Sequence, residues 1–437
     1  MKIFMLGWEF PPFISGGLGT ACYGLTKALS KLGVEITFVL PRPIGADGQA
    51  TYVQMRTPAD INFDNISRQE FEKGLKNIKF RSINSPLKPY STSESYRREI
   101  EDMIRAKQKR RGMTAGGEEG CLDSLAHYSG DMYAEVHRYA AAAVQLALQE
   151  DFDVIHAHDW MTYPAGMAVA AVTGKPLVVH VHSTEFDRSG EHVNQMIYDI
   201  ERAGMHTADR VIAVSFLTRN IIISRYSVNG DKVDVVYNGV ERNGNGLNFN
   251  RIGIRKDEKI VLFLGRITMQ KGPEYFLGAA KKVLDVMDNV KFVMAGSGDM
   301  MRKAVELAAQ LGIGSKVLFT GFLRGEDVRK VYEMADLYVM TSVSEPFGIA
   351  PLEALNHDVP VLISKQSGVS EVLTHVLKAD FWDVNEIANK IVAVLKYPPL
   401  QMALKEHGNF EVRRLKWEDA AQKCLQIYNQ LASAVCV

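Results

Sequence analysis

Two glutamates, Glu345 and Glu353, with seven residues between them, bracket a predicted turn between a strand and a helix. The apolar run over residues 337–342 predicts the strand, and the helix is expected to begin near Gly348. The first backbone N–H groups of such a helix point outward and can bind an anion or sugar hydroxyls. In this turn those groups belong to Phe347, Gly348 and Ile349. The two carboxylates are therefore either parts of a ligand site or solvated charges that favour the helix dipole.

Arg266 and Lys271 follow another predicted strand, over residues 259–265, just before Gly272 and Pro273 start a helix. Arginine can bind two oxygens of a phosphate at once, whereas lysine acts as a point charge. Two cations at the end of a strand therefore suit a diphosphate, although as isolated residues they could equally be surface charges.

A glycine-rich loop with Gly16, Gly17 and Gly19 follows the first predicted strand and precedes an apolar helix. A loop of this kind, leading into a helix N-terminus, can bind a phosphate. Ordinary strand-to-helix turns have the same composition, so the loop alone supports both interpretations.

Two histidine pairs end predicted strands: His156 and His158, followed by Asp159, and then His180 and His182. Because side chains alternate along a strand, the members of each pair share a face. The four imidazoles and the carboxylate could hold zinc or another divalent ion, as in a metal-dependent hydrolase. Alternatively, some of the histidines pack within the sheet and one forms a hydrogen bond with a sugar.

Taken in order, these segments resemble the retaining glycosyltransferases of the GT-B type. Within that group the resemblance is closest to glycosyltransferase family 4 and the related starch and glycogen synthases. It is carried by Gly-Gly-Leu-Gly after Pro-Pro, His-Ala-His-Asp-Trp, Gly-Arg followed by Gln-Lys-Gly, and Glu-Pro-Phe-Gly followed by Leu-Glu-Ala. These motifs extend over nearly the whole chain.

The resemblance implies a role for each candidate residue at the donor. Glu345 would contact the donor sugar, and Glu353 would bind the ribose of the nucleotide. The diphosphate would lie against Arg266, Lys271 and the backbone near Gly16 and Gly17.

The remaining expected contacts also follow from the resemblance. His182, as the active-site histidine, and Asp159 would contact the sugar. Phe322 and Leu323 stand where the family has its base-binding loop, and the helix start at Phe347, Gly348 and Ile349 completes the expected donor site.

The reaction that the resemblance implies is the transfer of a sugar, with glucose expected, from a nucleoside diphosphate sugar such as UDP-glucose or ADP-glucose. The anomeric configuration would be retained. Because cations and helix ends would neutralise the phosphates, no metal or other cofactor is expected. The glycogen synthase-like segments favour an α-glucan acceptor. Thr20 and Phe347 depart from the glycogen synthase pattern, where Asp and Cys are usual, so sucrose- or trehalose-type transfer, a lipid or another small-molecule acceptor stays open.

Alternatives from other classes are a glycan phosphorylase, a non-catalytic sugar-nucleotide-binding module and the metal-dependent hydrolase. A phosphorylase needs a lysine-bound pyridoxal phosphate and a much longer chain. A binding module would keep Arg266 and Lys271 but does not require His182 and Glu345 together.

Short apolar or β-branched runs alternate with helical patterns, which predicts an α/β fold of doubly wound parallel sheets. The resemblance implies GT-B architecture, with two Rossmann-like domains facing a central cleft. Ligands in such sheets bind beyond the carboxyl ends of the strands, where the candidate residues lie. The predicted strands span 2–7, 35–40, 153–158, 177–182, 210–214 and 233–237, and then 259–265, 291–295, 316–320, 337–341 and 360–363.

The first domain is expected over residues 1–245, with an insertion near 84–129, and the nucleotide-sugar domain over 246–412. An Asn- and Gly-rich segment, Glu241–Gly253, marks the join. A C-terminal helix within 413–437 is expected to pack back on the first domain, as the resemblance implies. The insertion carries a basic cluster, Lys107–Arg111, which is either a solvated helix face or part of a lid or acceptor-facing loop.

With 51 Lys and Arg against 51 Asp and Glu among 437 residues, the chain has no net charge that would favour nucleic acid. Four scattered cysteines without a C-x-x-C motif fit a reducing cytosol. We expect neither a signal peptide nor a membrane span, since no run reaches about 18 apolar residues. The expectation is a cytoplasmic protein that binds a donor and an acceptor, with its oligomeric state left open.

Overall fold

The computed structural model describes residues 1–11, 16–41, 77–83, 132–241 and 258–435. The expected insertion near 84–129, its basic cluster and nearly all of the expected join at 241–253 lie outside these residues. Contacts divide the chain into two compact units. The first is Met1–His180, Ile200–Val211 and Leu425–Val437, and the second is Val181–Asp199 and Ile212–Cys424.

A seven-stranded sheet lies in the N-terminal half of the chain, with the strand order β3-β2-β1-β4-β5-β6-β7. Its central pairs, β2 with β1 and β1 with β4, are parallel, and Ile3 lies opposite both Ile36 and Val154. This order places the first strand in the middle, as in doubly wound dinucleotide-binding folds. The strands are β1 (Lys2–Leu6), β2 (Glu35–Leu40), β3 (Ile78–Ser82), β4 (Val154–His158), β5 (Leu177–Val181), β6 (Arg210–Ala213) and β7 (Val233–Val235).

A six-stranded sheet in the C-terminal half has the equivalent order, β10-β9-β8-β11-β12-β13. All five neighbouring pairs are parallel. The strands are β8 (Lys259–Leu264), β9 (Val290–Ala295), β10 (Val317–Gly321), β11 (Leu337–Met340), β12 (Val361–Ser364) and β13 (Leu377–Ala379).

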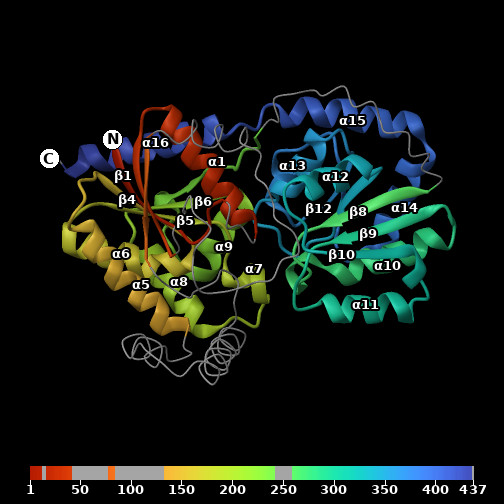
Figure 1. The fold of residues 1–437 in the computed structure, drawn as a ribbon, viewed down its shortest axis with the longest axis horizontal. Coiled ribbons are helices and arrows are strands. Elements are labelled where there is room, and N and C mark those ends of the chain that lie inside the picture. The colour runs from red at the N-terminus through yellow and green to blue at the C-terminus, as the bar shows by residue number, and fades with distance from the viewer. Residues whose placement is uncertain (12–15, 42–76, 84–131, 242–257, 436–437) are drawn as a thin grey trace, which may run out of the picture. The chain divides into compact units, whose positions relative to one another are not determined.

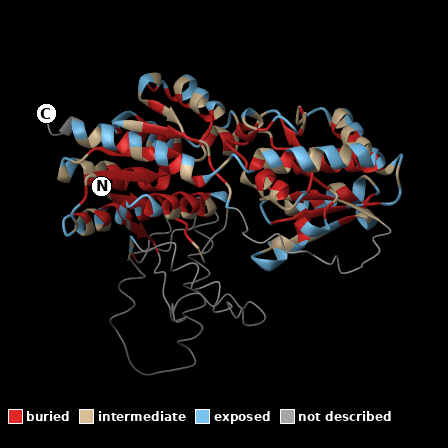
Figure 2. Ribbon diagram, turned by 90° about the horizontal axis from the view of Figure 1, so that it is seen from above, coloured by how far each residue is buried: buried red, intermediate tan, exposed pale blue. Residues whose placement is uncertain are grey.

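Helices cover the sheets, and in the second sheet the alternation of side chains explains how (Figure 1). Val261 and Phe263 of β8 pack with α10, α11 and α14 on one face, whereas Leu262 packs with α12 and α13 on the other. Both faces are buried, which is why the strands read as continuous apolar runs (Figure 2). The helices are α1 (Gly17–Lys31), α5 (Met132–Ala147), α6 (Tyr163–Thr173), α7 (Glu185–Ser189), α8 (Gln195–Thr207), α9 (Phe216–Tyr226), α10 (Pro273–Leu284), α11 (Met301–Gln310), α12 (Glu326–Met334), α13 (Ile349–Asn356), α14 (Val384–Lys396), α15 (Pro398–Val412) and α16 (Trp417–Val435).

The predicted fold class, two doubly wound parallel sheets, is confirmed. Each predicted strand overlaps an observed one, with ends that differ by at most two residues. Two strands were missed. In β3, Lys79 and Arg81 alternate with apolar residues and pair with Glu150, so the run lacks the apolar continuity of a buried strand. Strand β13 is only three residues long. No described helix combines the length and apolar character that a membrane span requires.

Candidate active site

The loops that leave the carboxyl ends of β8, β9, β11 and β12 are joined into one framework by backbone hydrogen bonds. The amide of Ile267 donates to the Ser297 carbonyl at 2.9 Å, and the amide of Val343 donates to the Gln270 carbonyl at 2.9 Å. The amide of Glu345 donates to the Gln366 carbonyl, also at 2.9 Å. This framework lies at the carboxyl ends of the strands, where doubly wound folds bind ligands, and it carries several of the predicted donor-site residues.

Glycines allow the backbones of these loops to approach one another closely. A Cβ at Gly296 would lie 1.8 Å from the Gly265 carbonyl oxygen, and one at Gly298 would lie 2.2 Å from that of Ile267. Gly272, with φ of 59°, would place a Cβ 2.3 Å from the carbonyl oxygen of Thr341. No other residue fits these positions without moving the loops.

We predict that Gly272→Ala destabilises the protein by about 3 kcal/mol, because a left-handed backbone and a steric clash act together. Gly312→Ala is the matched control. Gly312 also has a positive φ, of 70°, but has no atom within 4 Å of an added Cβ. It should cost about 1 kcal/mol, the strain alone. Urea unfolding measures the free energy of unfolding of both variants. If both lost the same amount, the close approach of residue 272 to Thr341 would be unimportant for stability.

Glu345 and Lys271 form an ion pair at the centre of this framework. Glu345 is 7% exposed, and the hydroxyl of Ser342 donates to its Oε2 at 3.1 Å. Its backbone is fixed as well, because Glu345 forms an isolated parallel bridge with Ser367. The interpretation of Glu345 as a solvated helix-start charge is therefore wrong: its carboxylate is buried and paired with a cation.

Arg266 is oriented by Gln270, whose Oε1 accepts a hydrogen bond from the guanidinium at 3.1 Å. Gln270 is buried, and its carbonyl is the one that holds Val343. One residue therefore joins the cation after β8 to the loop after β11. Nothing in the sequence alone singles out Gln270 for this role except its position beside Lys271.

The predicted helix N-terminus is observed where it was expected, because α13 begins at Ile349 after Gly348, whose φ is 104°. A Cβ at Gly348 would lie 3.2 Å from Cγ of Glu345, so the turn keeps the glutamate against the helix start. Phe347 is buried in the apolar core under α13, and its carbonyl accepts a hydrogen bond from Val369 at 2.7 Å. The side chain of Phe347 therefore supports the turn.

Glu353, inside α13, is only partly covered, and burial raises the pKa of its carboxyl. Its Oε2 accepts a hydrogen bond from the hydroxyl of Tyr332 at 3.0 Å. Like Glu345, it is held by a neighbour and is not an isolated surface charge. Tyr332 was not among the predicted site residues, because an aromatic residue on an amphipathic helix reads simply as core.

The loop after β10 presents Phe322 with 45% of its surface exposed, and the Arg324 guanidinium lies 5.2 Å from the ring centroid. Leu323 packs partly against the apolar core beneath α12 and α13. An exposed ring fixed by its neighbour offers a flat apolar surface at the carboxyl edge of the sheet.

His182 follows β5 and is partly exposed. Burial lowers the pKa of its imidazole to about 3, so the ring is neutral at physiological pH and can both donate and accept hydrogen bonds. The segment that follows is fixed by Asp187, which accepts hydrogen bonds from the amide of Thr184 at 2.7 Å and from the hydroxyl of Ser344. Ser344 is the residue before Glu345, so this buried aspartate also supports the loop after β11.

In the first compact unit, α1 begins at Gly17 directly after Gly16, so Gly17 and Gly19, which were expected in a loop before the helix, belong to its first turn. The buried carboxylate of Glu9 accepts a hydrogen bond from the amide of Gly19 at 3.1 Å, so one amide of this helix start is already satisfied by the protein. Asp159, after β4, is 7% exposed and has φ of 59°, a conformation that is uncommon for residues other than glycine.

Three of the four histidines of the hydrolase alternative, His156, His158 and His180, form a buried cluster, whereas His182 is only partly buried. The rings are stacked, with centroids 4.3–5.4 Å apart and planes within 29° of parallel. A metal ion lies in the plane of each imidazole that binds it, so one ion could bind all three only if the rings turned. The hydroxyl of Tyr428 also lies 2.6 Å from Nδ1 of His156. The arrangement favours packing within the sheet over a metal centre.

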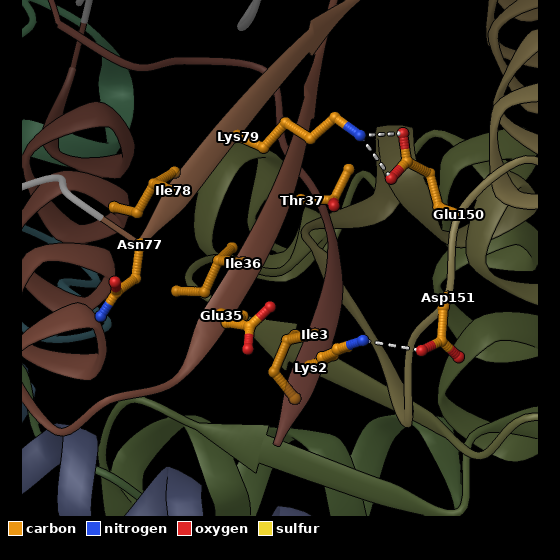
Figure 3. A pocket seen from close by; sticks show the side chains of 10 residues that line it. All are labelled: Lys2, Ile3, Glu35, Ile36, Thr37, Asn77, Ile78, Lys79, Glu150 and Asp151. Carbon is orange, nitrogen blue, oxygen red and sulfur yellow. Dashed lines mark hydrogen bonds and ion pairs between the residues drawn. The ribbon is translucent and has the colours of Figure 1, made fainter.

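A cavity of about 460 Å³ opens at the amino ends of β1, β2 and β3 in the seven-stranded sheet (Figure 3). The predicted ligand-binding residues lie at the opposite, carboxyl ends of the strands. Four of the charged side chains that line the cavity are paired: Lys79 donates to both oxygens of Glu150 at 2.8 Å, and Lys2 donates to Asp151 at 2.8 Å. None of the predicted site residues lines it.

Comparison with known proteins gives two family matches. Residues 246–409 match the family described as glycosyl transferases group 1, and residues 124–243 match glycosyltransferase family 4. An uncharacterized glycosyltransferase of Methanocaldococcus jannaschii is 30% identical over 98% of this chain and 98% of its own. A glycogen synthase of Mycobacterium tuberculosis is 22% identical over 98% of this chain and 94% of its own. The crystal structure of Anabaena HepE with UDP and glucose has a TM-score of 0.68 at 17% identity, covering 98% of this chain and all of that one.

Proposed function

This chain belongs to the group 1 glycosyltransferases of glycosyltransferase family 4, and from that premise we propose that it transfers glucose from a nucleoside diphosphate donor to an α-glucan, with retention of the anomeric configuration. The observation that carries the proposal is the pair of buried Glu345 and partly exposed Lys271 beside the helix start of α13. It puts a carboxylate, a cation and outward-facing amides in one place. A sugar diphosphate needs all three.

The diphosphate leaving group gains negative charge as the bond to the sugar breaks. Arg266 and Lys271 would bind its oxygens, with the amides near Gly16 and Gly17 as further donors. Such preorganised groups stabilise charge that develops in the transition state and therefore raise kcat. With two cations in this role, the proposal needs no metal ion or other cofactor.

Glu345 would orient the donor sugar and support the positive charge that develops near its anomeric carbon. Lys271 holds this carboxylate in the ligand-free protein, and a bound diphosphate would share the same ammonium group. The neutral imidazole of His182 and the carboxylate of Asp159 would form hydrogen bonds with sugar hydroxyls. Because the pKa of His182 is about 3, this imidazole is not a charged group at neutral pH.

The nucleoside would bind along the same edge of the second sheet. Glu353 would accept hydrogen bonds from the ribose hydroxyls, and Phe322 with Leu323 would contact the base. UDP-glucose is our first choice of donor, because the HepE complex contains UDP and glucose. The glycogen synthase among the relatives supports an α-glucan acceptor. The scattered cysteines favour the cytoplasm as the compartment of the reaction.

The release of nucleoside diphosphate from UDP-glucose and from ADP-glucose, with and without glycogen, tests this proposal. Release that depends on glycogen supports the α-glucan acceptor and identifies the donor. Release at the same rate with and without glycogen would overturn the assignment of an α-glucan acceptor. It would direct the search to small-molecule or lipid acceptors. No release from either donor would contradict the proposed donor class.

A further inference from the structure

The hydroxyl of Tyr332 is held between two groups of the helix that carries Glu353. It donates to Oε2 of Glu353 at 3.0 Å and also lies 3.2 Å from the carbonyl oxygen of Ala350. Tyr332 itself belongs to α12 and is 1% exposed. Within the described part of the chain, it is the only residue that donates a hydrogen bond to the Glu353 carboxylate.

From this contact we propose that Tyr332 is a positioning residue, which holds the Glu353 carboxylate in the orientation that binds the ribose hydroxyls and so sets the preference for ribonucleotides. The inference rests on the proposed function, because it takes Glu353 as the ribose ligand. It adds a residue on a different helix that would never touch the nucleotide.

The packing around Tyr332 leaves the phenol little freedom. Its ring stacks on His357, with centroids 5.3 Å apart and planes 12° from parallel, and lies 6.2 Å from the ring of Tyr338. A ligand group fixed in this way loses less conformational freedom when the ligand binds. Since Tyr332 uses only Oε2, the other carboxylate oxygen can accept a hydrogen bond from a ligand.

The chemistry of the pair agrees with this role. Burial raises the pKa of Glu353, and the hydrogen bond from Tyr332 counteracts that effect. The phenol therefore stabilises the ionised carboxylate, which is the form that accepts two hydrogen bonds from neighbouring ribose hydroxyls. Without the phenol, the carboxylate would be both less fixed and less readily ionised.

Tyr338→Phe is a matched control for Tyr332→Phe. Tyr338 is also a buried tyrosine of this cluster, but its hydroxyl donates to the backbone carbonyl of Leu264 at 3.3 Å and not to Glu353. Both substitutions remove one buried hydroxyl and keep the ring. They should therefore have similar effects on stability and different effects on the recognition of ribose.

The experiment is calorimetric titration of the full chain with UDP and with 2′,3′-dideoxy-UDP, and with the two corresponding adenosine compounds. The dissociation constant of the dideoxy compound divided by that of the ribonucleotide measures the ribose preference. We expect Tyr332→Phe to reduce this ratio about tenfold, which corresponds to one hydrogen bond to a charged group. Tyr332→Phe should leave the affinity for the dideoxy compound unchanged, and Tyr338→Phe should leave the ratio unchanged.

Glu353→Gln separates failure of this inference from failure of the proposed function. If Glu353→Gln reduces the ratio and Tyr332→Phe does not, Glu353 binds ribose without help from Tyr332, and the inference is overturned. If neither variant changes the ratio, or the wild-type chain binds none of the four nucleotides, the assignment of Glu353 to ribose is itself wrong. Equal reductions in Tyr332→Phe and Tyr338→Phe would show general loosening and would also overturn the inference.

Discussion

Replacement of Glu345 by alanine is expected to lower kcat by about 1,000-fold, the loss typical of a group that stabilises transition-state charge in a buried site. Glu345 is 7% exposed, and its carboxylate contacts Lys271 and Ser342, so its charge is held at a fixed place in the site. Glu345→Gln should lose about 100-fold, because the amide can still accept hydrogen bonds but carries no charge. Steady-state assays with the active donor measure both values.

Binding of the nucleoside diphosphate separates this effect from misfolding. Glu345→Ala frees Lys271 from its carboxylate, so the variant should bind the released nucleoside diphosphate as tightly as the wild type or more tightly. The matched control is Glu371→Ala. Glu371 accepts hydrogen bonds from the amides of Phe216 and Leu217 at 2.9 and 2.7 Å and so caps α9, which is a structural role. The Glu371→Ala variant should be less stable than the wild type and have the same kcat. A Glu345→Ala enzyme with more than a tenth of the wild-type kcat would contradict the proposed role.

Replacement of Lys271 by methionine is expected to lower kcat by about 100-fold and to weaken the binding of nucleoside diphosphate by about tenfold. Methionine preserves much of the apolar stem of lysine and removes only the charge, so the loss reports on the ammonium group. The effect on binding has the opposite direction to that of Glu345→Ala, because here the phosphates lose their partner. Calorimetry and steady-state kinetics on the same preparation measure the two effects.

Lys365→Met is the control for the loss of a lysine charge near the same loops. Lys365 pairs with Asp380 at 2.9 Å, and the two side chains are 48% and 28% exposed, so this solvent-accessible pair contributes little to stability. We expect it to leave kcat and nucleotide binding unchanged. If Lys365→Met weakened binding as strongly as Lys271→Met does, the effect would come from the overall charge of this face and not from a contact with the diphosphate.

The sequence predicts the parts of the fold that depend on local pattern. Continuous apolar runs mark buried parallel strands, and the rule that ligands bind at carboxyl ends selects the loops that carry Arg266, Lys271 and Glu345. The helix start at Gly348 is also predictable, because a turn and a glycine precede an apolar helix. The strands β3 and β13 lack these signals. Charged residues alternate with apolar ones in β3, and β13 is too short to show a pattern.

The contacts that organise the site are not predictable from local pattern. Lys271 and Glu345 are 74 positions apart in the sequence, and nothing in either segment indicates that they pair in the ligand-free protein. Tyr332 is 21 positions from Glu353 and looks like an ordinary core residue. Such contacts depend on the way loops from different strands meet. The placement of the donor residues around a nucleotide therefore stays a prediction, as do the domain limits at 245 and 412 and the packing of the C-terminal helix.

Retention is the part of the proposal that one measurement tests most directly. The donor that shows release is prepared with ¹³C at C1 of its α-linked glucose, and NMR follows the label during turnover with the acceptor, or with water where no acceptor is needed. We expect the first labelled product to carry the α configuration, with its formation slowed about 1,000-fold in Glu345→Ala. A first product with the β configuration would contradict retaining transfer at this site.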